Sequence, residues 1–427
     1  MKISDFPNAV IKENVDYTVK EITNVIKKYG PRESGNEACF DAQKHLKKEL
    51  DQFCDETHFE EYKMAPRAFL HFTKLVSALV IAAVVIGFGL VFALNFENFF
   101  IAHCIVGVCV AIGLFITAME FLMYKQFMDG MYKKVTAHNL VATRKPRGEV
   151  KKRIVISGHI DAAYEWRPIY LLKDKGMGLW MGLSIGTAVI SLIISVLSVI
   201  ANFVDMGAFG DFMLNYSFYF NVLTAVSMVL LFTFVNFGRI SPGANDNLTG
   251  TYAAVCALRM LDMAGVDLEH TEVVAMITDG EEAGLRGAKA FAKAHKDEYL
   301  NDGVETAVLC VDTLTDLEYL NVYHKDMTGT VKNDLAFSEL VQKSAADAGY
   351  DSAQLANLFF GASDAAAFSQ AGIKATCLAA MDPAPADYYH NRRDSYDRLN
   401  PQAIETGYKT VLATIFNFDA GDRKSVV

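Results

Sequence analysis

Three short clusters of acidic and histidine residues follow apolar stretches of the chain. His159-Ile160-Asp161 follows the run RIVISG, Asp279-Gly280-Glu281-Glu282 follows EVVAMIT, and Asp312 follows AVLCV. Each of these runs is short, apolar and rich in β-branched residues, as is typical of a buried strand. Imidazole and carboxylate groups bind metal ions and transfer protons. The three clusters are therefore the first candidates for a chemical site.

Two further segments contain residues of the same types. Gly243 to Asn247 (GANDN) precedes a helix-like segment, and the polar loop from Tyr388 to Asp394 contains a second imidazole, His390. Each cluster alone has an ordinary explanation, because Asp and Asn cap helices and paired glutamates often begin them. In one crevice the carboxylates would repel one another strongly unless cations offset their charge. These carboxylates are Asp161, Asp246, Glu281, Glu282 and Asp312.

An α/β sheet can bring these clusters together. Helix-like segments, notably Leu248–Ala264 and Leu285–Lys296, alternate with the strand-like runs, which favours a mixed, mostly parallel central sheet with flanking helices. In open α/β sheets, ligands bind beyond the carboxyl ends of the strands. We therefore expect the clusters to converge. Two histidines with several carboxylates suit zinc first, and manganese or cobalt second.

Four apolar stretches interrupt this pattern. They are Leu75–Leu94, Asn98–Met119, Gly176–Val204 and Phe212–Gly238, and none contains Asp, Glu, Lys or Arg. A helix of about 20 apolar residues spans a hydrocarbon core of about 30 Å. Buried helices of a soluble protein normally show a polar face, which these stretches lack. The sequence therefore predicts four transmembrane helices, paired as two hairpins by the short turns Asn95–Glu97 and Asp205–Asp211.

The charges around the hairpins predict their orientation. The two turns contain acidic residues but no Lys or Arg, whereas the opposite flanks are basic, with Lys74 before the first hairpin and Lys175 before the second. By the positive-inside rule, the polar domain and both termini face the cytoplasm and the turns face the outer side. The first residues also lack the apolar region of a secretory signal. The protein is thus expected to be an integral membrane protein with four spans.

Composition narrows the class of partner. The formal net charge is −10 and no cluster of Lys and Arg occurs, which excludes a nucleic-acid partner. The seven cysteines are scattered and are expected to be reduced thiols. Glycines in the predicted spans permit close helix packing but do not specify an oligomeric state. Six other histidines are expected at the surface: His58, His71, His138, His270, His295 and His324.

Taken in order, the motifs resemble those of the di-zinc aminopeptidases of metallopeptidase family 28. They are H-x-D, D-N-x-x-G, E-E-x-G-L-x-G, an Asp after a strand, and Y-H with a following Asp. The similarity covers nearly all of the polar chain and extends to Gly361–Phe368, which resembles the family's S-D-x-x-x-F segment. The resemblance implies the zinc aminopeptidase, phosphorylase-like fold. It identifies the chain as a membrane-integral member of the family.

The resemblance also implies a role for each site residue. Five residues would hold two zinc ions: His159 and Asp312 one ion, Glu282 and His390 the other, and Asp246 both. Asp161 would orient His159. Glu281 would be the general base toward a metal-bound water, whose pKa zinc lowers to about 7. The predicted substrate is a peptide, cleaved at its N-terminal bond. Asn391 stands where the family commonly has Ser or Thr.

The expected peptidase domain is interrupted twice, with parts at residues 1–72, 125–175 and 239–427 and hairpins at 73–124 and 176–238. Other interpretations stay open. They are a non-catalytic membrane scaffold or receptor, a transporter, and a carboxypeptidase, dipeptidase or glutaminyl-cyclase-like enzyme of the same fold. Few ionisable groups in the spans argue against a transporter, and the pair Glu281–Glu282 favours a peptidase over a cyclase. Since the second hairpin begins soon after Asp161, peptides released at the bilayer are expected substrates.

Overall fold

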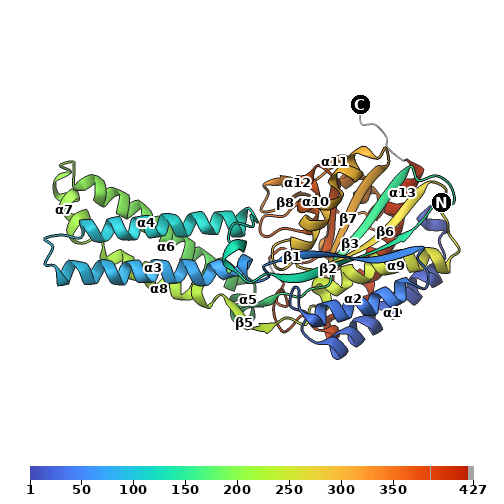
Figure 1. The fold of residues 1–427 in the computed structure, drawn as a ribbon, viewed down its shortest axis with the longest axis horizontal. Helices are drawn as coiled ribbons and strands as arrows, with labels where there is room; N and C mark the ends of the chain where they lie inside the picture. The colour runs from blue at the N-terminus through green and yellow to red at the C-terminus, as the bar shows by residue number, and fades with distance from the viewer. Residues whose placement is uncertain (385, 422–427) are drawn as a thin grey trace. The chain divides into compact units, whose positions relative to one another are not determined.

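The computed structural model of the chain describes residues 1–384 and 386–421, without the side chain of residue 174. The chain forms two compact units, each assembled from separate stretches. The first unit comprises Met1–Pro66, Tyr132–Glu165 and Gly238–Val427, and the second comprises Arg67–Met131 and Trp166–Phe237. The first unit contains the central sheet, whereas the second consists largely of helices (Figure 1).

A mixed sheet forms the centre of the first unit. Its described strands run in the order β1-β2-β6-β3-β7-β11-β8-β10, with β9 paired to β8. The four central strands β6, β3, β7 and β11 are mutually parallel, so their carboxyl ends lie at one edge. The strands are β1 (Glu56–Met64), β2 (Val135–Arg144), β3 (Lys152–His159), β6 (Thr271–Thr278), β7 (Glu305–Leu314), β8 (Leu320–Asp326), β9 (Val331–Lys332), β10 (Leu355–Asn357) and β11 (Lys374–Ala380).

Helices flank this sheet. Five of them share one hydrophobic core with the strands: α1 (Asn8–Tyr29), α2 (Glu37–Leu50), α9 (Thr249–Met263), α11 (Leu335–Asp347) and α13 (Pro401–Ala420). In Figure 1, α1, α2 and α9 lie together along one side of the sheet. Helix α9 is buried along nearly its whole length, as expected of a helix that is apolar or small all round. Helices α10 (Arg286–Asn301) and α12 (Asp364–Ala371) contact each other through Phe291 and Phe368.

The strand predictions are confirmed, with small differences at the ends. Strands β3 and β6 coincide with the predicted runs, whereas β7 continues through Asp312 to Leu314. The mixed, mostly parallel sheet with flanking helices is therefore the predicted α/β architecture. The prediction that His138 lies at the surface is wrong. Its side chain is buried, since its ring stacks on Phe40 with the ring centroids 3.7 Å apart.

The second unit contains the apolar helices. They are α3 (Ala68–Ala93), α4 (Phe100–Thr117, extended by a π-helical turn Ala118–Leu122), α6 (Asp174–Ala201), α7 (Gly207–Asn215) and α8 (Tyr219–Thr233), with the short α5 (Arg167–Leu172) before α6. Among the described residues, α3, α4 with its π turn, and α6 are long and apolar enough to cross a membrane. Helices α7 and α8 satisfy the same criteria only as a pair, and the pair is bent by 45°.

The fourth predicted span thus differs from the helix that was expected over Phe212–Gly238. The helical region begins earlier, at Gly207, breaks after Asn215 and ends at Thr233, before β5 (Val235–Ile240), which pairs with β4 (Tyr164–Trp166). Side chains near the break bond to carbonyls one turn back: Asn215 Nδ2 donates to Asp211 O and Ser217 Oγ donates to Met213 O. Such bonds often bend helices. A prediction based on the length of an apolar stretch does not detect these bonds.

Candidate metal centre

The carboxyl edge of the parallel strands carries the predicted site residues. His159 is the last residue of β3, and Glu281 and Glu282 follow β6. Asp312 lies near the end of β7, Asp246 precedes α9, and His390 lies in the loop after β11. Elements far apart in sequence therefore meet at one edge, because parallel strands end on the same side of a sheet. All seven predicted residues, including Asp161, lie in the first unit.

Asp246 lies between the two imidazoles. Its Oδ1 is 3.3 Å from Nε2 of His159, and its Oδ2 is 3.1 Å from Nε2 of His390. Glu282 Oε2 lies 3.3 Å from the same nitrogen of His390, and Asp312 Oδ1 lies 4.0 Å from Nε2 of His159. Two three-residue groups of possible ligands result, and Asp246 belongs to both. Asp246 is therefore placed where two neighbouring cations could share its carboxylate.

The donor atoms fit zinc. Nε2 of His159 and Oε1 of Glu282 are buried, and neither forms a hydrogen bond with the described residues. Buried polar atoms normally have a partner. Zinc binds imidazole nitrogen and carboxylate oxygen at about 2.0–2.2 Å, which separates tetrahedral ligand atoms by about 3.3 Å. The separations of 3.1–3.3 Å around Asp246 and His390 agree with this value.

The electrostatics also favour a cation. Burial by itself lowers the pKa of His159, but nearby carboxylates, Glu281 first, raise that pKa well above its usual value. Burial, followed by the charge of Asp246, raises the pKa of Glu282 well above its usual value and that of Asp312 to about 7. Carboxylates in such surroundings hold protons unless another positive charge offsets them. Bound divalent cations would supply that charge.

Asp161 supports both the imidazole and the paired glutamates. Its Oδ1 accepts the backbone N–H of Glu281 at 3.2 Å, and its Oδ2 accepts that of Glu282 at 3.1 Å. The hydroxyl of Ser34 donates to the same Oδ2 at 2.6 Å. Nδ1 of His159 lies 3.1 Å from the carbonyl oxygen and 3.5 Å from Oδ1 of Asp161. Asp161 therefore contacts both the ring of His159 and the backbone of the paired glutamates.

The Glu281 side chain faces the ligands. Its Oε2 lies 3.9 Å from Nε2 of His159, and His159, Glu281 and Glu282 form a third group of closely spaced donor atoms. Burial raises the pKa of Glu281 well above its usual value, and the nearby Asp364 and Asp312 add to the effect. A carboxyl group with a raised pKa beside a reaction site can both accept and donate a proton near neutral pH.

The sequence did not reveal the role of Asp394 in supporting the Asp246 loop. Its Oδ1 accepts the backbone N–H of Asn245 at 2.9 Å, and its Oδ2 accepts that of Asp246 at 3.1 Å. Asn391, the departure from the family pattern, is fully buried, and its Nδ2 donates to the carbonyls of Asp387 and Tyr389. Asn391 therefore organises the loop that carries His390.

Arg32 is the second support that sequence reasoning missed. Its side chain is fully buried, and it donates from Nε to the carbonyl of Ile160 at 2.8 Å and from Nη2 to that of Gly243 at 2.9 Å. It thus connects the segment after β3 with the segment before Asp246. The residues around Arg32 read PRESG, which is an ordinary polar connection between helices. Only its burial identifies its importance.

One family model matches part of the chain. Residues 229–415 match the model of peptidase family M28. This M28 region contains Asp246, Glu281, Glu282, Asp312 and His390, while His159 and Asp161 precede it. No curated protein matches the sequence.

Solved structures share the fold. The zinc aminopeptidase BSAP from Bacillus subtilis is 14% identical, with a TM-score of 0.55 and 95% of each chain covered. The LapA aminopeptidase of Legionella pneumophila is 13% identical, with a TM-score of 0.52, covering 96% of this chain and 74% of that one. A glutaminyl cyclase from Fimbriiglobus ruber is 14% identical, with a TM-score of 0.52 and 94% of each chain covered. At these identities the likeness shows the fold.

Proposed function

We propose that this protein is a membrane-anchored, zinc-dependent aminopeptidase of family M28. The observation that carries the proposal is the position of Asp246 between His159 and His390, with Asp312 and Glu282 beside them. The M28 match and the fold likeness to zinc aminopeptidases support it. The peptidase domain would be one fold interrupted twice by membrane segments.

The ligands divide into two sets. His159 and Asp312 would hold one zinc ion, Glu282 and His390 the other, and Asp246 both, as the two groups of neighbouring donor atoms suggest. When bound, the two ions supply Lewis-acid chemistry and positive charge at the amide carbonyl. The protein's own contribution is to fix these donors before substrate arrives. Asp161 does so through the His159 ring and the backbone of the paired glutamates.

Glu281 would transfer the protons. It lies beside the ligands, with its Oε2 3.9 Å from Nε2 of His159, and it is not one of the five proposed ligands, which leaves its carboxylate for an attacking water. It would accept the proton of that water and then donate a proton to the leaving amine. A positioned general base typically contributes about 10²–10⁴-fold to the rate. A backbone fixed by Asp161 keeps Glu281 in place for both transfers.

The membrane part of the proposal rests on the apolar helices. Three described helices are long and apolar enough to cross a membrane, and the bent pair α7–α8 would supply the fourth span. The basic flanks would then place the peptidase domain and both termini in the cytoplasm. Protease protection in sealed vesicles tests this topology. We expect the protease to cleave the peptidase domain when it is added to the cytoplasmic side of the membrane. We expect no cleavage of that domain when the protease is added to the other side.

The decisive experiment compares detergent-purified wild type with Glu281→Gln, using metal analysis and hydrolysis of aminoacyl amides and dipeptides. We expect at least two zinc ions per chain in both proteins and a loss of about 10²–10⁴-fold in kcat for the variant. Glu339→Gln, at an exposed position on α11, is the matched control and should keep full activity. Wild type without zinc and without hydrolysis would instead indicate a membrane scaffold.

A second candidate function is cyclisation of N-terminal glutamine. It is favoured by solved structures of glutaminyl cyclases that share the fold at similar TM-scores. An assay with a peptide that begins with glutamine separates the two. Release of free glutamine supports the aminopeptidase, whereas a product lighter than the peptide by one ammonia supports the cyclase.

A further inference from the structure

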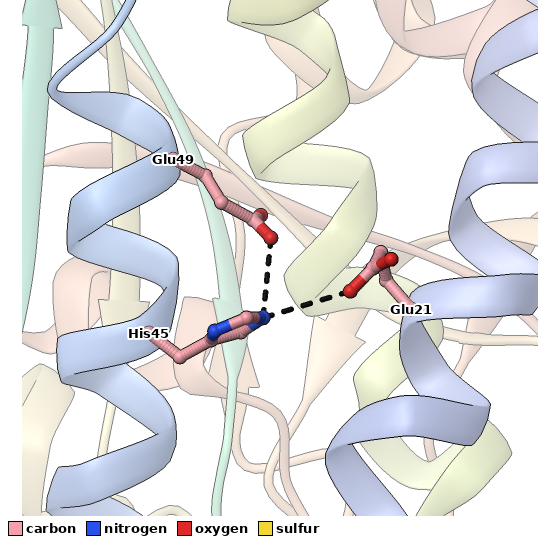
Figure 2. A group of neighbouring side chains, drawn as sticks. All are labelled: Glu21, His45 and Glu49. Carbon is pink, nitrogen blue, oxygen red and sulfur yellow. Dashed lines mark ion pairs between the residues drawn. The ribbon is translucent and has the colours of Figure 1, made fainter.

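A second group of metal-binding side chains lies in the first unit, away from the candidate metal centre. Glu21 extends from α1, while His45 and Glu49 extend from α2 one turn apart, and both carboxylates point toward the same ring nitrogen (Figure 2). Nε2 of His45 lies 3.2 Å from Oε1 of Glu49 and 3.5 Å from Oε2 of Glu21. The three donor atoms lie within 4.8 Å of one another.

The ring nitrogen of His45 is close to both oxygens but forms a hydrogen bond with neither. Nε2 of His45 and Oε2 of Glu49 are buried atoms without a hydrogen-bond partner among the described residues. An N–H group that pairs with a carboxylate normally points at one oxygen. A nitrogen placed between two oxygens has instead the position of a ligand that shares an ion with them. The separations of 3.2 and 3.5 Å bracket the value of about 3.3 Å expected around tetrahedral zinc.

A further buried polar group lies in the core that α9 shares with α1 and α2. Tyr252 on α9 is fully buried, and its hydroxyl has no hydrogen-bond partner among the described residues. Burial, followed by the charge of Glu49, raises the pKa of Tyr252 well above its usual value, with Glu21 also contributing. The ring of Tyr252 packs edge-on against Tyr17 of α1, with the ring centroids 6.1 Å apart. Three protein donors leave the fourth position of a tetrahedral zinc site for a water molecule.

We propose that Glu21, His45 and Glu49 bind one divalent cation of the zinc class, with a water molecule completing a tetrahedral site. One imidazole with two carboxylates is a zinc donor set, whereas magnesium and calcium prefer oxygen donors alone. The two carboxylates supply the negative charge that holds the ion. The His45 side chain is 26% exposed, which gives an ion a path from solvent.

The proposed ion would clamp α1 to α2. The segment that connects these two helices supports the candidate metal centre, because Ser34 binds the carboxylate of Asp161 and Arg32 binds the carbonyl of Ile160. Holding the two helices together would therefore hold these supports in place. The ion would stabilise the peptidase unit without touching the substrate, which makes the site structural.

The test removes the candidate metal centre first. In the variant His159→Ala/His390→Ala, which lacks one imidazole from each group of the candidate centre, we expect about one zinc ion per chain to remain after equilibration with micromolar zinc. Adding His45→Gln removes this ion. Zinc should also raise the melting temperature of the double variant by about 3 °C or more, and leave that of the triple variant unchanged.

His295→Gln is the matched control in the same background. The His295 ring also lies between two glutamates, Glu60 at 2.8 Å and Glu298 at 3.0 Å, but with a separate nitrogen hydrogen-bonded to each. Its replacement should leave the zinc content unchanged. Glu21→Gln provides a second route if the His45 variant does not fold.

Two results would overturn the proposed clamp. One is a double variant that binds no zinc, and the other is zinc that persists after both His45→Gln and Glu21→Gln. The outcome is independent of the proposed function. Wild type with one zinc ion that depends on His45, and with no peptidase activity, would contradict the proposed aminopeptidase and leave the clamp intact.

Discussion

The hydroxyl of Ser34 donates a hydrogen bond to Oδ2 of Asp161 at 2.6 Å, although 127 positions separate the two residues in the sequence. Both side chains are buried. The same carboxylate accepts the backbone N–H groups of Glu281 and Glu282. The connection between α1 and α2 therefore supports the residues proposed to hold zinc and to transfer protons.

Replacing Ser34 by Ala should lower activity without removing the metal. The variant leaves one buried lone pair of Asp161 without its donor, and hydrogen bonds to charged groups contribute about 1.5–3 kcal/mol. We expect kcat/KM to fall about tenfold with unchanged zinc content. Ser4→Ala, which removes an exposed hydroxyl beside Asp5, is the control and should leave kcat/KM unchanged. Loss of zinc from Ser34→Ala would contradict this expectation.

Asp394→Asn should weaken zinc binding. Both oxygens of Asp394 accept backbone N–H groups of the Asp246 loop, and an amide would turn an NH₂ group toward one of them. Changes to residues that support metal ligands typically cost 10–100-fold in metal affinity. Competition with a chromophoric chelator should show a zinc Kd raised by about that factor. Asp397→Asn, at an exposed position nearby, should retain the wild-type Kd; equal Kd values in both variants would refute the prediction.

Gly250 explains why the D-N-x-x-G motif ends in glycine. A Cβ atom at this position would lie 2.1 Å from the carbonyl oxygen of Val311 and 2.4 Å from Asn247 Oδ1. Since the backbone cannot move aside easily, Gly250→Ala should destabilise the first unit by about 3 kcal/mol or more. Gly89→Ala, where a Cβ meets no atom within 4 Å, should be tolerated. Thermal unfolding in detergent measures both, and a stable Gly250→Ala protein would disprove the crowding argument.

The contact of His295 with Glu60 predicts a pH-dependent stability. Hydrogen bonds to Glu60 first, and to Glu298, raise the pKa of His295, whereas burial opposes the shift. Burial also acts against the charged form of Glu60, but His295 lowers the pKa of that carboxyl. The stabilisation by His295 is complete below its unfolded pKa of about 6.5 and is lost as pH rises through the folded pKa. That of Glu60 is lost as pH falls below about 4.3.

His295→Gln should therefore lower the melting temperature most near pH 5.5 and least near pH 9. Since the pair is partly exposed, the difference should correspond to only about 0.5–1 kcal/mol. His324→Gln, a histidine without a carboxylate contact among the described residues, should change the melting temperature equally at both pH values. A pH-independent effect of His295→Gln would show that the lost contact is packing and not charge.

The sequence predicts those residues of the candidate centre whose positions follow from the strand order alone. His159, Glu282 and Asp312 follow or end buried strands, and parallel strands bring their carboxyl ends to one edge. Ser34 and Arg32 were not predictable, because they lie in a connection between two helices and act on segments more than a hundred residues away. The periodicity of apolar residues indicates which side chains share a face of one helix or strand, and it does not indicate contacts between distant segments.

The apolar helices of the second unit were predicted from their length and composition. Apolar length predicted α3, α4 and α6 well, since a hydrophobic run of that length has few other folded states. The break between α7 and α8 was missed, because it coincides with side chain to backbone hydrogen bonds of single residues such as Ser217. The mean hydropathy of a long window does not reveal hydrogen bonds that single side chains make.

The order of the segments along the chain constrains the timing of synthesis. His159 at the end of β3 is translated before α6, α7 and α8, whereas Asp246 is translated after them. The two strands that border β3 in the sheet, β6 and β7, also come later. A ribosome-bound chain therefore exposes β3 without neighbours until every apolar helix has emerged. The candidate metal centre would then be complete only after every apolar helix has been made, so the proposed hydrolytic activity would be absent from unfinished chains.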